Sequence, residues 1–124
     1  MKRDMDLVRK ILMVCADHEH GFAPRALQIE GYSEEQVGHH AYLMLEAGLV
    51  KGVDVTPKHA TSPQASVTSI TWDGHEFLEA SRDEGLWSKA KKAAGSSGGM
   101  VLEVLKSVLV GLATDAAKKA AGLP

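Results

Sequence analysis

The 124-residue sequence has few cysteines, few aromatic residues and no long apolar run. Its single cysteine, Cys15, excludes an internal disulfide framework and a multi-cysteine metal site. The most apolar stretch, 100–113, is shorter than the roughly 20 residues of a membrane-spanning helix and is interrupted by Glu103 and Lys106. The segment Met1–Asp6 leads into an amphipathic pattern and lacks the features of a secretory leader. These absences predict a soluble, cytoplasmic protein with no membrane span.

Charge is nearly balanced overall but unevenly distributed along the chain. The formal net charge is −2, yet residues 1–87 carry eight Lys and Arg against fourteen Asp and Glu, and residues 88–124 carry six Lys against two acids. Nucleic-acid binding draws its affinity from Lys and Arg that contact phosphates. An acidic body with a basic tail therefore argues against DNA binding by the body and leaves the tail as the basic surface.

The first third of the chain predicts one helix and one short strand. Apolar residues at helical spacing indicate a helix that is capped by Asp4 and stopped by Gly21. The alternation in Leu27-Gln28-Ile29 predicts a short strand, which turns at Glu30-Gly31.

The stretch Tyr32–Val50 predicts a helix with both ends marked. Ser33 and Gln36 form a capping box, and Gly48 supplies a left-handed exit, as in a Schellman ending. The apolar stripe from Val37 to Leu45 faces the core.

Two strands, a polar loop and two helices are expected next. Residues 49–56 and 66–72 predict antiparallel strands, joined by a wing-like loop at 57–65. Thr71 caps the following helix, and residues 86–94 predict a short basic helix. Trp72 and Trp87 are expected to fill the core.

The C-terminal part predicts a linker and an amphipathic helix. Gly95–Gly99 has the composition of a flexible linker, and Met100–Ala121 favours a helix with a leucine stripe. That helix could pack on its own body or on a second copy, and the linker favours the second copy. We therefore expect a homo-oligomer, with a dimer favoured. The self-association residues are Leu102, Leu105, Leu109 and Leu112.

Three ordered motifs carry a family resemblance. The opening MKRDMDLVRKIL, the segment IEGYSEEQVGHHAYLMLEAGLV and the segment SPQASVTSITWDGHEFLEASRD are similar to a family of small bacterial and prophage-borne proteins, catalogued as the domain-of-unknown-function 2513 family. The end of the second motif and ITWDGHEFL also resemble the recognition-helix end and post-wing helix of winged-helix proteins. The resemblance covers about residues 1–94 and carries over no site residues.

The resemblance implies an α+β, mostly α fold. Its winged-helix-like domain at 1–94 would run helix, short strand, helix, two-stranded wing and helix. A Gly/Ser linker at 95–99 and a C-terminal helix at 100–124 would follow. One departure concerns DNA binding, because a helix-turn-helix needs a helix of its own before the recognition helix. Only Glu30-Gly31-Tyr32 separates Ile29 from Ser33.

Two classes of macromolecular partner are open. The outward face of the 32–50 helix and the wing predict a surface for a protein partner, and the protein reading is favoured. The alternative is a DNA-binding transcriptional regulator of bacterial or prophage origin, with backbone contacts from the wing and the basic helix. The residues of the predicted partner-binding face are Glu34, Glu35, His39, Tyr42, Lys58 and His59. The predicted phosphate contacts are Lys58, Lys89, Lys91 and Lys92.

Enzymatic and metal sites find no support in the sequence. The histidines of Asp17-His18-Glu19-His20 and of His39-His40 do not share one helical face, as a metal-binding pair would. Cys15 lies on the apolar face of the first helix, where a buried thiol is expected rather than a nucleophile. We therefore expect a binding protein rather than an enzyme, with no cofactor, no metal and no small-molecule substrate.

Overall fold

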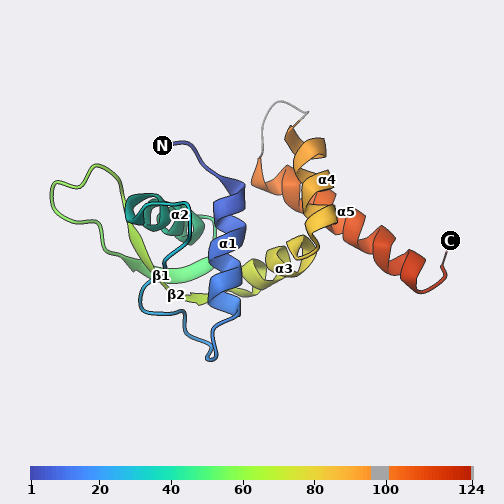
Figure 1. Ribbon diagram of the computed structural model, residues 1–124, viewed down its shortest axis with the longest axis horizontal. Coiled ribbons are helices and arrows are strands. Elements are labelled where there is room, and N and C mark those ends of the chain that lie inside the picture. Colours follow the sequence, from blue (N-terminus) through green and yellow to red (C-terminus); the bar gives the residue numbers. More distant parts are fainter. Residues whose placement is uncertain (96–100, 124) are drawn as a thin grey trace. The chain divides into compact units, whose positions relative to one another are not determined.

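The computed structural model describes residues 1–95 and 101–123, which form five helices and a two-stranded antiparallel sheet (Figure 1). The predicted fold class, α+β and mostly helical, is confirmed. The elements are α1 (Met5–Ala16), α2 (Glu34–Glu46), β1 (Val50–Asp54), β2 (Ala65–Ile70), α3 (Trp72–Ser81), α4 (Glu84–Gly95) and α5 (Leu102–Ala120).

The chain divides into two compact units, Met1–Leu78 and Glu79–Pro124. The first unit holds α1, α2, the sheet and most of α3, and the second holds α4 and α5. The basic helix α4, which the sequence groups with the winged-helix-like domain, therefore belongs with α5. Apart from Gly95, the predicted Gly95–Gly99 linker lies outside the described residues.

The N-terminus of α1 is tied to α2 by a small polar cluster. Asp4 caps α1, because its Oδ1 accepts hydrogen bonds from the backbone N–H groups of Asp6 and Leu7. Its Oδ2 accepts from the Tyr32 hydroxyl at 3.0 Å. The buried His40 ring accepts from the Asp4 N–H through Nε2, so its Nδ1 carries the proton that is donated to the Gln36 carbonyl.

Both ends of α2 have the predicted geometry. The Ser33 side chain accepts from the Gln36 N–H, and the Gln36 side chain accepts from the Ser33 N–H. At the other end, Gly48 has a φ of 76°, and the N–H groups of Gly48 and Leu49 bond to the carbonyls of Leu45 and Met44. This pair of bonds is a complete Schellman motif.

The core of the first unit lies among α1, α2 and the sheet, which pack on one another (Figure 1). Its buried side chains come mainly from the apolar faces that helical spacing predicts. They include Leu7, Ile11, Leu12, Val37, Ala41, Met44, Leu49, Val67 and Leu78.

The sheet is a ribbon whose third strand is missing. The predicted strand at Leu27–Ile29 is not formed, and the described sheet contains β1 and β2 alone. The segment between α1 and α2 donates one hydrogen bond to β2, from the Ala23 N–H to the Thr68 carbonyl at 2.9 Å. Alternate residues of a strand direct their N–H groups to the same neighbour, so the next donor to β2 would be Arg25, and it forms no backbone hydrogen bond among the described residues. Between α1 and α2 there is also no helix, as the sequence predicts.

Residues of the second and third family motifs meet at the start of α3. Thr71 donates its N–H to the Leu49 carbonyl and its hydroxyl to the Gly48 carbonyl, and its Oγ1 accepts from the Gly74 N–H. A Cβ atom on Gly74 would lie 2.0 Å from the Leu49 carbonyl oxygen. Thr71 and Gly74 are therefore needed to join the end of α2 to the start of α3.

In the second unit, α4 and α5 pack on each other. Trp87, Ala90 and Ala94 of α4 are buried, as are Leu105 and Leu109 of α5. From Thr114 to Ala120, every residue of α5 is exposed. No helix among the described residues is long and apolar enough to cross a membrane.

Candidate functional site

The loop between β1 and β2, residues 55–64, is fastened to the first half of α2, and we call it the wing loop. The Glu35 carboxylate accepts hydrogen bonds from the hydroxyls of Thr61 and Ser62 at 2.5 and 2.8 Å. One turn further along α2, His39 Nδ1 lies 3.0 Å from the Pro63 carbonyl oxygen. Two of the predicted partner-binding side chains are therefore already bonded to the wing loop.

A glycine allows the wing loop to lie this close to α2. A Cβ atom on Gly38 would come within 2.9 Å of Oε1 of Gln64. At the base of the wing loop, Asp54 accepts from the N–H and hydroxyl of Thr56, and Thr56 Oγ1 accepts from the Gln64 N–H. The wing loop is thus held both at its base and along α2.

These hydrogen bonds lower the pKa values of two carboxyl groups. The hydroxyls of Thr61 and Ser62 lower the pKa of Glu35, since they stabilise its ionised form. The Thr56 hydroxyl and N–H lower the pKa of Asp54 for the same reason. When they are ionised, both carboxyl groups therefore stabilise the wing loop in its bonded position.

The other residues of the predicted face remain available on the surface. Glu34, Lys58 and His59 are exposed, and Tyr42 is half-buried with its ring stacked on His39 at 6.4 Å between centroids. His59 has a φ of 64°, an unusual backbone conformation for a residue other than glycine. No Lys or Arg occurs between Glu34 and Glu46, so α2 offers no cation to a phosphate.

Beside α2 lies a groove that sequence reasoning missed. It comprises two adjoining hollows of about 220 and 440 Å³ between the connector 24–30, the start of α2 and β2. Both hollows are lined by Glu34, a predicted partner-binding residue. The groove exists where the predicted third strand does not form, and no local sequence signal marks that failure.

Three of the four predicted phosphate-binding lysines belong to the second unit. Lys89 and Lys92 are exposed on α4, and Lys91 Nζ lies 5.6 Å from the centre of the Trp87 ring. Lys58 is on the wing loop of the first unit. The four lysines are therefore divided between two units.

Part of the leucine stripe of α5 is buried within the single chain. Leu105 and Leu109 are fully buried, and Leu102 and Leu112 are half-buried. Among the described residues, the large apolar side chains that remain exposed on or next to α5 are Val101, Val104, Val110 and Leu123.

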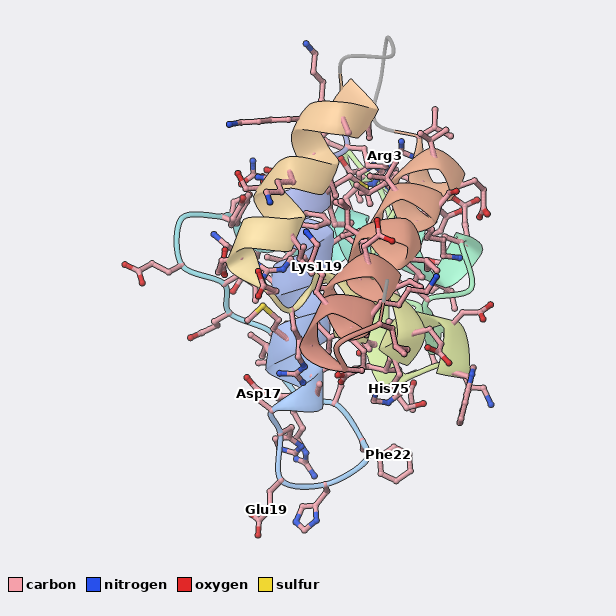
Figure 2. The ribbon with its side chains drawn as sticks, turned by 90° about the vertical axis from the view of Figure 1, so that its right-hand side faces the viewer. Arg3, Asp17, Glu19, Phe22, His75 and Lys119 are labelled. Carbon is pink, nitrogen blue, oxygen red and sulfur yellow. The ribbon has the colours of Figure 1, made fainter. Side chains whose placement is uncertain are left out.

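One core prediction was wrong. Trp87 is buried as predicted, but the Trp72 side chain is 80% exposed. Thr71 and Gly74 meet the ribbon at the start of α3, and the side chains of the two residues between them, Trp72 and Asp73, are exposed. Phe22 is also exposed, and Figure 2 shows it pointing away from the loop that follows α1.

The structure holds no arrangement that resembles a metal site or a reactive thiol in its described part. No group of three or more His, Cys, Asp or Glu side chains is close enough to hold a metal ion within residues 1–95 and 101–123. Burial raises the pKa of Cys15 to about 11, which keeps the thiol protonated and unreactive at neutral pH.

Comparison with known proteins gives the chain a family. Residues 2–100 match the model of a family described as hypothetical protein, domain of unknown function 2513. A relative from Haemophilus influenzae, described as an uncharacterized protein, is 29% identical over 110 residues, which span 87% of this chain and 92% of the relative. No solved structure matches. The chain belongs to the domain-of-unknown-function 2513 family.

Proposed function

We propose that this protein is a non-enzymatic binding module that acts as an adaptor or regulator, and that it engages a protein partner through α2 and the wing loop. The observation that carries the proposal is the composition of α2 and the bonding of its outward side chains. The helix contains no lysine or arginine, and its Glu35 and His39 side chains bond to the wing loop. A helix in that state has neither phosphate-binding cations nor free side chains at these positions for reading bases.

Exposed aromatic residues support a protein partner. Trp72 and Phe22 are two of only six Trp, Tyr and Phe residues in the chain, and both are exposed. Tryptophan is enriched among the residues that contribute most to protein–protein affinity. An acidic surface also favours a basic protein partner over a nucleic acid.

The protein reading can be tested with two matched carboxylate variants. Full-length protein with Glu34→Gln or Glu46→Gln would be cross-linked in bacterial lysate and the captured proteins compared. Both carboxylates are exposed on α2, but Glu34 is its first residue, next to the wing-bound Glu35, and Glu46 is its last. We expect Glu34→Gln to lose a partner that Glu46→Gln retains. Equal capture by both variants would refute this surface.

DNA binding is the alternative, favoured by the lysines of α4. A random-sequence duplex would be titrated with the full-length protein at low and high salt. We expect no binding. A shift that weakens steeply with salt and disappears on combined Lys89→Ala, Lys91→Ala and Lys92→Ala substitution would overturn the protein proposal in favour of DNA.

A further inference from the structure

The groove beside α2 has an apolar floor and a charged rim. Val37 and Ile29 are buried in it, and Leu27 and Val37 line both of its hollows. Its rim carries exposed polar side chains at both ends. The combination of an apolar floor with a few polar groups is typical of binding sites.

Charge differs between the two ends of the groove. Arg25 lines the smaller hollow, Glu30 lines the larger one, and Glu34 lines both. In the described part of the chain, no hydrogen bond or ion pair engages the side chains of Glu30 and Glu34. The end formed by the larger hollow therefore favours a cationic side chain.

Part of the described backbone along the groove forms no hydrogen bond to other backbone groups. The Ala23 N–H bonds to β2, but from Arg25 to Gln28 no backbone hydrogen bond forms among the described residues. An extended segment presents N–H and C=O groups along its length and can bond to such a stretch while it seats alternate side chains in pockets. A compact ligand would leave these groups unused.

We propose that this groove binds an extended segment of a protein partner that carries a bulky apolar side chain next to a lysine or arginine. The apolar side chain lies over Val37 and Leu27, and the cation pairs with Glu30 and Glu34. The segment lies in extended form in the groove, where the predicted third strand of the sheet does not form. This inference rests on the proposed function, because it names the chemistry of the protein partner at the same end of α2.

Labelled ten-residue peptides test the inference directly with the full-length protein. One peptide would carry two leucines flanked by lysines, a second would replace the lysines by glutamates, and a third would replace the leucines by serines. We expect fluorescence anisotropy to show binding of the first peptide and at least tenfold weaker binding of the other two. Equal binding of the first two peptides, or no binding of any, would overturn the proposal.

Two protein variants locate the binding. Gln28→Trp places a large side chain at an exposed position that lines both hollows, whereas Thr68→Trp makes a similar change at an exposed position of β2 that lines neither. We expect Gln28→Trp to weaken binding of the lysine–leucine peptide at least tenfold and Thr68→Trp to leave it unchanged. Circular dichroism would confirm that both variants are folded. Equal weakening by both would place the peptide elsewhere and refute the groove.

The outcomes separate the two proposals. If the cross-linked partner depends on Glu34 but the peptides do not bind, the protein-binding module stands and the groove chemistry is wrong. If no partner depends on Glu34 and the lysine–leucine peptide still binds in the groove, the groove chemistry stands and the proposed α2 and wing-loop surface is wrong.

Discussion

At the scale of single residues, the two tryptophans show how local backbone geometry decides exposure. Trp87 is 2% exposed on the inner side of α4, where it is buried with Ala90 and Ala94. Trp72 is 80% exposed, because its neighbours Thr71 and Gly74 make the contacts with the ribbon. A large apolar side chain held on a fixed turn contributes little to stability and is available to a partner.

The first prediction concerns these two residues. Replacing Trp87 with alanine should lower the free energy of unfolding by about 3–5 kcal/mol, because it leaves a large cavity. Trp72→Ala should change it by about 0.5 kcal/mol or less, as is usual at exposed positions. Urea unfolding followed by circular dichroism measures both. A large loss for Trp72→Ala would show that the indole packs against the protein.

A second prediction concerns Gly74. Gly74→Ala forces a Cβ atom against the Leu49 carbonyl and the Ile70 side chain, so it should lower the free energy of unfolding by about 1–3 kcal/mol. Gly21→Ala is the matched control, since an added Cβ there meets nothing within 4 Å. Similar unfolding midpoints for the two variants would contradict the close approach at the start of α3.

At the scale of elements, α2 and the wing loop behave as one structural piece. The capping box and the Schellman motif fix the ends of the helix, and Glu35 and His39 fix the wing loop along it. In a DNA-binding winged helix these outward positions would meet bases. Here they are used internally, which leaves Glu34 and the neighbouring groove as the available part of the helix start.

A third prediction follows from the lowered pKa of Glu35. A carboxyl group whose folded-state pKa is depressed stabilises the bonded wing loop at pH values above the pKa of that group in the unfolded chain. This contribution is lost as pH falls through the lower, folded-state pKa. NMR relaxation of the backbone amides of Thr61 and Ser62 should therefore show greater mobility in acid than at neutral pH.

Variants separate Glu35 from the general effects of acid. Glu35→Ala should make the wing loop mobile already at neutral pH and reduce the further change on acidification. Glu34→Ala, one residue away, should retain the profile of the unaltered protein. If the two variants gave the same relaxation values, the hydrogen bonds from Thr61 and Ser62 would not be what holds the wing loop.

At the scale of the whole molecule, the two units differ in charge and in exposed apolar surface. The first unit carries the acidic α2 and the groove, and the second carries the lysines of α4 and the exposed valines next to and on α5. Because Leu105 and Leu109 are buried in the single chain, self-association through α5 would have to use apolar side chains that remain exposed, among them Val104 and Val110. We propose this revised surface for the dimer that the sequence predicts.

The fourth prediction tests self-association. Light scattering should give a mass that approaches twice the 13.3 kDa of one chain as concentration rises. Combined Val104→Ser and Val110→Ser substitution should return the mass to that of one chain, because it removes exposed apolar surface without touching the buried leucines. A single-chain mass at all concentrations would exclude self-association.

The local elements could be read directly from the sequence because their signals are local. Ser33 and Gln36 mark the start of α2, Gly48 marks its end, and Asp4 marks the start of α1. Each acts through hydrogen bonds or backbone angles within a few residues. The resemblance in the three ordered motifs likewise identified the family, since it depends on residue order alone.

Only the tertiary structure decided which surfaces remain free. The Leu27–Ile29 segment alternates like a strand, but strand formation needs a continuous ladder with β2, and that ladder stops after one bond at Ala23. Glu35 and Trp72 each satisfy a local pattern, yet one is bonded to a loop 26 residues away and the other faces solvent. Local propensity is fixed by neighbours along the chain, whereas exposure and pairing depend on segments that only folding brings together.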